Sequence, residues 1–540
     1  MMSETFDFDR LINRRGTFSY KWDSDADPDM LPMWVADMDF ETAPAVLEAV
    51  RHRAAHGIYG YTRVPDAFYE SLIGWFARRH KFRLTREDIL YTTGVVPGLS
   101  CTIKALTTPG DKVVILTPVY NLFFTSIRNN GCLASESPLV VKDGRYTIDF
   151  VDLEKKLSDP AARVMLMCNP HNPGGRVWTP EELARVGELA RRHRVTVISD
   201  EIHGEFVFKG RRYTPFAAAP GNSLRESVML TSTSKSFNTA GLQIAAIITA
   251  DPALRAKIEH AVNVNEVCDV NPFGPAAAVA AYNKGEAWLD ALIAYIEEND
   301  RTLRAFFAGH LPDFPVMPLE GTYLEWVDIS ALGADSRTVQ ASLKEHEKVW
   351  LNAGMNYGAD AGRHYLRINI ACPRSRLTEG LKRIEAGLKR LKTAWSLSGQ
   401  KVRCRFPKVR QRHRAADSLQ GIGIHGAGSP RKVNLKGTGP GGLYHHCRER
   451  LKALGLCART PDAVYRPRVA VAGHGDKGVR CKGLHFFRKK RAYSLEPYAA
   501  ALPHLFVQSF GFQFDKLNNP RLKARGLLTR CRLSRNSQGF

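Results

Sequence analysis

A lysine flanked by small hydroxyl residues is the first feature of the sequence that suggests chemistry. Lys235 lies in the segment Thr231–Asn238 (TSTSKSFN), which directly follows a short apolar run. The hydroxyls of Ser232 and Ser234 can hold a phosphate group while the lysine amine reaches an aldehyde. Pyridoxal 5'-phosphate (PLP) needs this combination of a phosphate anchor and a Schiff-base amine on one turn. The segment alone leaves a second interpretation open, in which Lys235 belongs to a Ser/Thr-rich surface loop.

Two more polar groups follow apolar runs. Asp200 ends one run, in SDEIHGE, and Asn172 lies between two prolines in the segment Cys168–Gly175 (CNPHNPGG). A carboxylate can pair with the pyridinium nitrogen of PLP, and an asparagine amide held by a loop rich in proline and glycine can be directed at the phenolic oxygen. Each motif alone is also compatible with a helix cap, a surface acid or a turn. Together, in this order and at strand ends, the three motifs favour a PLP site.

Short apolar runs that alternate with helical patterns predict how these groups are positioned. Five runs are expected to be strands of a sheet covered on both faces: Lys112–Leu116, Val164–Cys168, Val195–Ser199, Val228–Thr231 and Ile244–Thr249. Between two of them lies TPEELARVGELARRHR, which predicts an amphipathic helix with Thr179 as N-cap, Pro180 in the first turn and Glu182 completing a capping box. This order predicts a mainly parallel α/β sheet. Ligands bind beyond the carboxyl ends of such strands, where the polar motifs lie.

The second part of the chain has a different pattern. A long helical stretch begins near Ala287, extended segments follow (TYLEWVDI and HYLRINIA), and a basic amphipathic helix precedes Trp395. This order predicts a smaller α+β domain. We expect four regions: an N-terminal segment that packs with the small domain (1–45), a large PLP-binding domain (46–285), the small domain (286–395) and a basic extension (396–540).

The net charge of +23 is distributed unevenly. Residues 396–540 carry 30 Lys and Arg against 6 Asp and Glu, whereas the preceding 395 residues carry 47 against 48. We expect the extension to be disordered or irregular, because it shows no sustained helix or strand period. Two interpretations remain open: a tail that contacts nucleic acid with strong salt dependence, or the product of a shifted reading frame or of read-through. The tail lacks helix-turn-helix, RNP-type and zinc-finger patterns.

Cysteine spacing bears on disulfide and metal binding, and hydropathy bears on the cellular location of the protein. The ten cysteines suggest neither a disulfide framework nor a zinc ribbon. No metal is expected, because the spacing of the tail residues His445, His446, Cys447 and Cys457 does not suit a tetrahedral site. No apolar run is long enough to span a bilayer, and the N-terminus has no secretory apolar region. We therefore expect a cytoplasmic protein without a membrane partner.

Ordered motifs along residues 5–394 carry a family resemblance. They include FDRLINRRGTFSYKWD, MWVADMDF, GIYGYT, TTGVVPGL, TPVYNLFF, CNPHNPGGRVW, SDEIH, TSTSKSFNTAGLQ and YLRINIACPRS. With them the chain resembles the class I/II aminotransferase-like enzymes of PLP fold type I, and within these the carbon–sulfur β-lyases of the MalY/PatB type (cystathionine β-lyases). The resemblance implies an α/β fold in which helices flank a mainly parallel sheet, a smaller α+β domain, and PLP as cofactor.

The resemblance also implies roles for individual residues. Lys235 would form the internal aldimine, Asp200 would face the ring nitrogen, and Asn172 would bond the phenolic oxygen. Tyr120 of TPVYNLFF would stack on the ring. Arg367 of YLRINIA would bind the α-carboxylate of an amino-acid substrate bidentately. The alternative for Arg367 is a structural salt bridge.

Phosphate binding and the oligomer are implied in the same way. The phosphate would be held at a helix N-terminus suited to an anion, by backbone amides and hydroxyls of Gly94, Val95, Val96, Ser232 and Ser234. Tyr61 of GIYGYT would reach the phosphate of the neighbouring subunit. The active unit would then be a homodimer.

Two positions depart from the aminotransferase pattern. His203 stands where many aminotransferases carry a tyrosine that bonds the phenolic oxygen, and Gln243 stands where they carry a phosphate-binding arginine. Both departures agree with the β-lyase branch. We therefore expect α,β-elimination, in which Lys235 removes the Cα proton and a thiolate leaves from Cβ. Cystathionine would give homocysteine, pyruvate and ammonia, with transamination on the same lysine as the alternative.

Overall fold

A seven-stranded sheet forms the centre of the large α/β part. The computed structural model describes residues 6–403, and the side chains of residues 6–394. The strand order is β2-β10-β9-β8-β7-β3-β4, with β2 (Ile89–Thr92), β3 (Lys112–Thr117), β4 (Leu133–Pro138), β7 (Ala162–Cys168), β8 (Thr196–Asp200), β9 (Ser227–Thr231) and β10 (Ala245–Ile248). Strand β10 runs antiparallel to both of its neighbours, and the other neighbouring pairs are parallel. The predicted strands and the mainly parallel sheet are confirmed.

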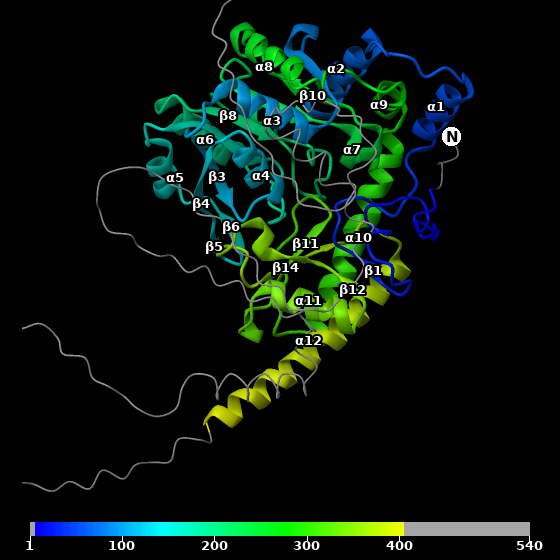
Figure 1. Cartoon of the computed structure of the whole chain (residues 1–540), viewed down its shortest axis with the longest axis vertical. Helices are drawn as coiled ribbons and strands as arrows, with labels where there is room; N and C mark the ends of the chain where they lie inside the picture. The colour runs from blue at the N-terminus through cyan, green and yellow to red at the C-terminus, as the bar shows by residue number, and fades with distance from the viewer. Residues whose placement is uncertain (1–5, 404–540) are drawn as a thin grey trace, which may run out of the picture. The chain divides into compact units, whose positions relative to one another are not determined.

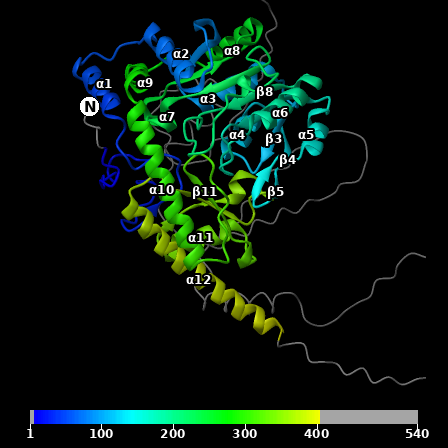
Figure 2. The ribbon, with the colours of Figure 1, turned by 180° about the vertical axis from the view of Figure 1, so that it is seen from behind.

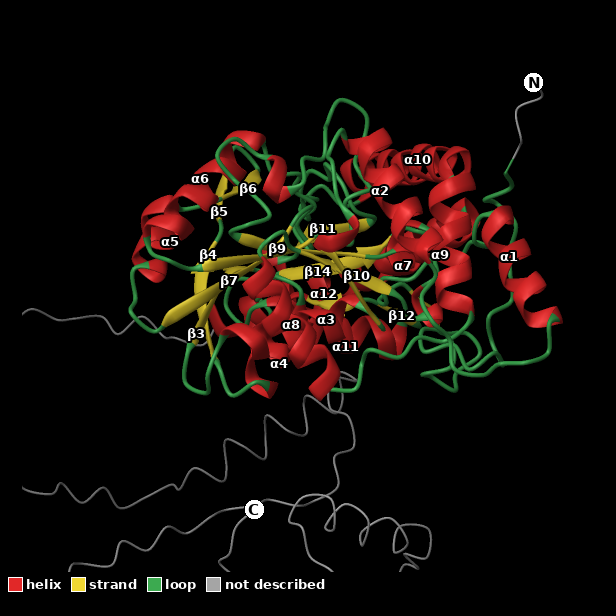
Figure 3. Cartoon of the chain, turned by 90° about the horizontal axis from the view of Figure 1, so that it is seen from above, coloured by secondary structure: helices red, strands yellow, loops and turns green. Residues whose placement is uncertain are grey.

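Helices cover both faces of this sheet, as Figure 3 shows. In β3, Val113 and Ile115 pack in one apolar cluster, whereas Val114 and Leu116 pack in another. Successive side chains of a strand point to opposite faces, so a strand covered on both sides is apolar at every position. The first cluster includes α3 (Val95–Leu106), α4 (Asn121–Asn129) and α8 (Pro252–Val264), and the second includes α5 (Phe150–Leu157) and α6 (Pro180–Arg192).

Helix α6 begins as its sequence predicts. The Thr179 hydroxyl accepts a hydrogen bond from the backbone N–H of Glu182 at 3.2 Å, and the Glu182 carboxylate accepts one from the N–H of Thr179 at 2.8 Å. Pro180 occupies the first turn. This reciprocal capping box satisfies two amides that a helix start leaves without partners.

A smaller sheet and three long helices follow. The sheet has the antiparallel order β11-β14-β13, with β11 (Leu324–Asp328), β13 (Asn352–Ala353) and β14 (Tyr365–Asn369). The helices are α10 (Glu286–His310), α11 (Ser336–His346) and α12 (Arg374–Arg403). Near the N-terminus, β1 (Leu31–Pro32) pairs with β12 (Val349–Trp350). The N-terminal segment therefore lies beside this second region, as Figures 1 and 2 show.

The remaining elements connect or cover these sheets. They are α1 (Pro44–Ala55), α2 (Asp66–His80), β5 (Val140–Lys142), β6 (Arg145–Thr147), α7 (Thr233–Ser236), α9 (Phe273–Lys284) and short 3₁₀ turns, among them Ala240–Leu242. In the described part of the chain, no helix has both the length and the apolar character that a membrane span requires.

One expectation about the end of the body needs correction. Helix α12 continues past residue 395 to Arg403, although the helical pattern was expected to fail at residue 396. Extending an existing helix is easier than starting one, so a helix can run on into a weaker sequence. The expectations for residues 404–540, including a disordered or irregular tail, lie outside the described residues. The four region boundaries remain a prediction.

Candidate active site

Lys235 lies on the short helix α7, directly after β9. Its Nζ donates a hydrogen bond to the carbonyl oxygen of Ala36 at 2.5 Å. Burial lowers the pKa of Lys235 to about 8, against the opposing attraction of the Asp37 carboxylate. Part of the amine is therefore unprotonated near neutral pH, which a nucleophile or a general base requires.

Asp200 ends the neighbouring strand β8. Burial raises its pKa to about 7, while the positive charge of Lys235 acts in the opposite direction. Tyr120 is the N-cap of α4, after β3. Burial raises the pKa of Tyr120, and the charge of Asp200 raises it further. Asp200 acts electrostatically on both other groups, and each of the three lies at the carboxyl end of a strand of the same sheet, with Asp200 buried and Lys235 and Tyr120 partly buried.

Asn172 and Arg367 meet in this site from different sheets. Arg367 Nη1 donates to Asn172 Oδ1 at 3.2 Å, and Arg367 Nη2 donates to the carbonyl of Trp34 at 2.7 Å. The guanidinium lies 4.8 Å from the ring centre of Tyr357. Its Nε is buried and has no hydrogen-bond partner. Within residues 6–394, the hydrogen-bond partners of the Arg367 guanidinium are an amide oxygen and a backbone carbonyl, and no carboxylate pairs with it, so the structural salt bridge left open by the sequence is not formed there.

The loop that carries Asn172 depends on a glycine. Gly175 has φ +64°, a conformation that residues with a Cβ rarely adopt. A Cβ at this position would also lie 2.5 Å from Leu319 Cδ1. The glycine therefore permits both the turn and the close approach of the neighbouring segment.

The residues expected at the phosphate lie at two helix starts. Gly94 is the N-cap of α3, and no side chain caps this helix. The first amides of a helix have no partners within it, so those of Val95 and Val96 suit an anion. Ser232 caps α7: its Oγ accepts from the N–H of Ser234 at 3.1 Å and lies 2.7 Å from Ser234 Oγ.

The sheet explains why these positions come together. Gly94, Tyr120, Asn172, Asp200 and Ser232 follow or end the strands β2, β3, β7, β8 and β9, respectively. These five strands run in one direction, because only β10 is reversed. Their carboxyl ends therefore share one edge of the sheet, where open α/β sheets bind ligands.

The other predicted positions differ in their surroundings. His203 is buried, its ring packs edge-on against Tyr323 at 5.6 Å, and its Nδ1 has no partner. Burial and the positive charges of Lys235 and Arg367 lower its pKa well below the usual value, so the imidazole is neutral. Tyr61 is fully exposed and is not part of the buried site of its own chain.

Gln243 has a distinct backbone position. It follows the turn Ala240–Leu242 in the left-handed conformation, with φ +51°. Its backbone N–H donates to the carbonyl of Ala240 at 3.4 Å. The described contacts of Gln243 are thus those of a turn.

Several residues at the site were not identified from the sequence. The carbonyls of Trp34 and Ala36 accept hydrogen bonds from Arg367 and Lys235, and Asn369 binds the same segment. The motif MWVADMDF contributed to the resemblance, but no contact could be assigned to it. Asn369 follows Arg367 by two residues, so the period of a strand places both on one face.

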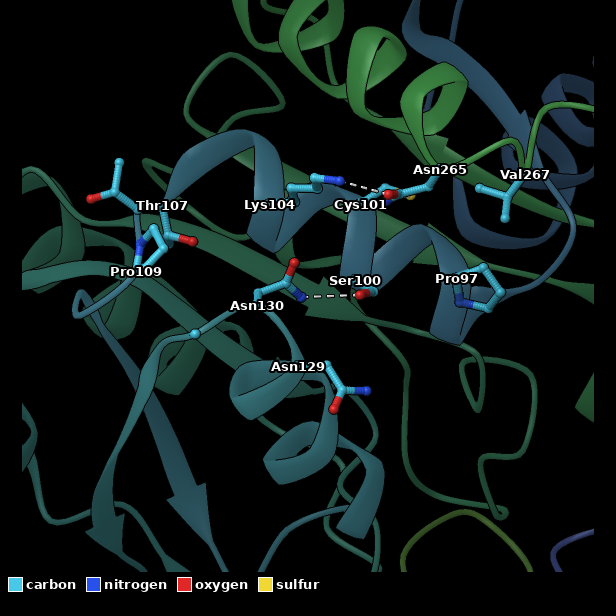
Figure 4. A pocket seen from close by; sticks show the side chains of 12 residues that line it. Pro97, Ser100, Cys101, Lys104, Thr107, Pro109, Asn129, Asn130, Asn265 and Val267 are labelled. Carbon is cyan, nitrogen blue, oxygen red and sulfur yellow. Dashed lines mark hydrogen bonds between the residues drawn. The ribbon is translucent and has the colours of Figure 1, made fainter. Parts of the chain in front are cut away.

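The described residues fit PLP as a ligand. The site combines a partly unprotonated lysine, a buried carboxyl group, an uncapped helix start and buried nitrogen atoms without partners at His203 and Arg367. A separate surface hollow of about 730 Å³ lies along α3 and shares none of these residues. Figure 4 shows that its polar side chains bond one another, Lys104 with Asn265 and Asn130 with Ser100.

Comparisons with known proteins agree with this site. The family "Aminotransferase class I and II" matches residues 28–384. Cystathionine beta-lyase PatB of Bacillus subtilis (strain 168) is 43% identical over 385 residues, which are 71% of this chain and 99% of the relative. The structure of cystalysin from Treponema denticola, which contains pyridoxal 5'-phosphate, has a TM-score of 0.69 and 32% identity, and the match covers 72% of this chain and 100% of cystalysin.

A second solved structure points the same way. The PLP-bound C-S lyase from Staphylococcus hominis has a TM-score of 0.67 and 34% identity, and the match covers 71% of this chain and 99% of the lyase. The resemblance expected from the sequence and PLP fold type I are thus confirmed. This chain belongs to the aminotransferase class I and II family.

Proposed function

We propose that this protein is a PLP-dependent carbon–sulfur β-lyase. It cleaves L-cystathionine or related cysteine S-conjugates by α,β-elimination to a thiol, pyruvate and ammonia. The observation that carries the proposal is the 43% identity to a cystathionine beta-lyase over 99% of that relative's length. The site geometry supports an amino-acid substrate, because a buried guanidinium without a carboxylate partner lies in the same site as the catalytic amine.

Each predicted residue receives a role in this proposal. When bound, PLP supplies an electron sink for the negative charge that develops at the substrate Cα. Lys235 holds the cofactor and moves the Cα proton through its Nζ. Asp200 pairs with the ring nitrogen, and Asn172 bonds the phenolic oxygen. Tyr120 stacks on the ring, and Arg367 binds the α-carboxylate.

The phosphate is proposed to lie between the starts of α3 and α7. The amides of Gly94, Val95 and Val96 suit an anion there. The hydroxyl of Ser234, which lies 2.7 Å from Ser232 Oγ, would turn toward the phosphate to add a donor. Ser232 donates its own hydroxyl proton to the carbonyl of Ile244 at 2.6 Å. Ser232 therefore orients Ser234 and caps α7, and it contributes less directly to the phosphate than the sequence suggested.

The proposal includes a cytoplasmic homodimer. Tyr61 is fully exposed, and Ile58 and Tyr59 in the same segment are also largely exposed. A second copy of the chain would cover this segment and bring Tyr61 to the phosphate of its neighbour.

His203 remains neutral and occupies the position of the aminotransferase tyrosine.

Product analysis tests the reaction. The holoenzyme is incubated with L-cystathionine in the absence of any keto acid, and pyruvate and free thiol are assayed. A lyase releases the two products in equal amounts. A transaminase releases neither product in repeated turnovers under these conditions. If a second incubation with a keto acid consumes that keto acid while the first yields no pyruvate or thiol, the proposal is overturned.

A further inference from the structure

One short segment contacts both catalytic and substrate-binding side chains through its backbone. We call residues Trp34–Asp37 the strap. The carbonyl of Trp34 accepts from Arg367 Nη2 at 2.7 Å, and the carbonyl of Ala36 accepts from Lys235 Nζ at 2.5 Å. The hydroxyl of Tyr323 also donates to the carbonyl of Ala36, at 3.0 Å. The strap therefore contacts both side chains, and Asn172 is the other hydrogen-bond partner of the Arg367 guanidinium.

Asn369 holds the strap from β14. Its Nδ2 donates to the carbonyls of Val35 at 2.5 Å and Asp37 at 2.7 Å, on either side of Ala36. Its Oδ1 accepts from the N–H of Ala371 at 2.8 Å, so the amide group is fixed in this orientation. The side chain is buried, with 2% of its surface exposed.

The strap has no strand partner that would fix it by a regular ladder. In the described structure it has no helix or strand assignment, and side chains satisfy its carbonyls instead. The loss of a buried donor leaves the acceptor unsatisfied, which costs more than the hydrogen bond itself contributes. Removal of the Asn369 amide would leave the Val35 carbonyl in this condition and the Asp37 carbonyl with only the longer hydrogen bond from Lys21 Nζ at 3.4 Å, which would allow the segment to shift.

We propose that Asn369 is a positioning residue: by holding the strap, it orients the Arg367 guanidinium toward the substrate α-carboxylate and keeps the Ala36 carbonyl at Lys235. Asn369 and Arg367 lie on the same face of β14, two residues apart, so a single strand carries both the guanidinium and its support. The inference rests on the proposed function, because Arg367 is taken as the carboxylate-binding group.

Binding of an unreactive amino acid to the holoenzyme tests this role. L-Alanine has the α-carboxylate but no leaving group at Cβ, and its binding changes the visible absorption of the bound cofactor. Asn369→Ala is expected to weaken binding about tenfold, equivalent to about 1.4 kcal/mol. In a chain that already carries Arg367→Ala, the same substitution is expected to have no further effect, because contacting groups are not additive.

Asn299 provides a matched control. Its buried Nδ2 also donates to two backbone carbonyls, those of Ile370 at 2.8 Å and Cys372 at 2.9 Å, but neither belongs to the strap. Asn299→Ala should lower the melting temperature to a similar extent and leave alanine binding unchanged. If Asn369→Ala does not fold, Asn352→Ala takes its place, because Asn352 Nδ2 donates to the Trp34 carbonyl at 2.7 Å.

The possible results separate this inference from the proposed function. Three results would overturn the positioning role alone. Alanine binding could be unchanged in Asn369→Ala or its replacement Asn352→Ala, or it could be weakened equally by Asn299→Ala. The effects of Asn369→Ala and Arg367→Ala on binding could also simply add. Binding that is insensitive to Arg367→Ala itself would overturn the proposed carboxylate site, and the positioning role with it.

Discussion

The guanidinium of Arg367 donates to the side-chain oxygen of Asn172 at 3.2 Å, although 195 positions separate the two residues along the chain. Asn172 belongs to the loop after β7 of the seven-stranded sheet, whereas Arg367 belongs to β14 of the three-stranded sheet. The contact joins a residue assigned to the cofactor with one assigned to the substrate. A change in either side chain should therefore affect the other.

The first prediction concerns Lys235, the lysine proposed to bind PLP. The purified holoenzyme should be yellow, and borohydride should bleach its visible band by reducing the covalent linkage. Mass spectrometry should then find the adduct on Lys235, whose amine is partly unprotonated. Lys21 is buried, but it is paired with Asp39 at 3.1 Å and should carry no adduct. An adduct on a different lysine would contradict the assignment.

Arg367→Ala should weaken substrate binding and leave the cofactor in place. Hydrogen bonds to charged groups contribute about 1.5–3 kcal/mol each, so kcat/KM for cystathionine should fall by roughly tenfold or more. The visible absorption of the cofactor should remain. Arg304→Ala is the control, because Arg304 likewise donates two hydrogen bonds through its guanidinium, to the carbonyls of Val316 and Met317, and pairs with Asp300 away from the site. The Arg304→Ala variant should lose stability and keep the KM for cystathionine. Unchanged catalysis in Arg367→Ala would show that Arg367 has a structural role.

Asp200→Asn should stabilise the apoprotein at alkaline pH. Burial raises the pKa of Asp200 from 3.8 to about 7, so between these values the folded chain keeps a proton that the unfolded chain has lost. The contribution of Asp200 to the free energy of unfolding therefore decreases as the pH rises to about 7 and then stays low. Asparagine does not ionise, so the variant should gain up to about 4 kcal/mol at pH 8.

Urea unfolding of the two apoproteins at pH 5, 6 and 8 measures this difference. The gap in the free energy of unfolding should be largest at pH 8, stay nearly constant down to about pH 7, and then shrink as the pH falls to 6 and 5. A gap that is constant over this range would show that Asp200 does not titrate there. With PLP bound, the same substitution should reduce lyase activity, since a charge partner for the ring nitrogen is lost.

The last prediction concerns residues 396–540. A chain that ends near Trp395 should remain folded, dimeric and active, because the family match ends at residue 384 and the body before the extension is nearly neutral. Limited proteolysis of the full chain should leave a fragment of about 395 residues. Any affinity for nucleic acid should depend strongly on salt and be lost with the extension. Aggregation or loss of PLP on truncation would place the boundary elsewhere.

Most of the large sheet could be predicted because short stretches of sequence show the residue patterns that buried strands and helix starts require. A strand such as β7, buried on both faces, is apolar at nearly every position, and a capping box such as that of Thr179 and Glu182 marks a helix start. The end of α12 was harder to predict. The helical pattern of the sequence fails at Ser396, yet a helix already begun continues to Arg403.

The sequence by itself determined which residues are the candidates for the chemistry, because Lys235, Asp200 and Asn172 have side chains suited to PLP and end or follow strands whose carboxyl ends must meet. Only the tertiary structure decided what holds these groups. The partners of Lys235 and Arg367 include the carbonyls of Ala36 and Trp34. Every residue type has a backbone carbonyl, so contacts to carbonyls cannot be predicted from residue types. These contacts form only when folding brings distant segments together.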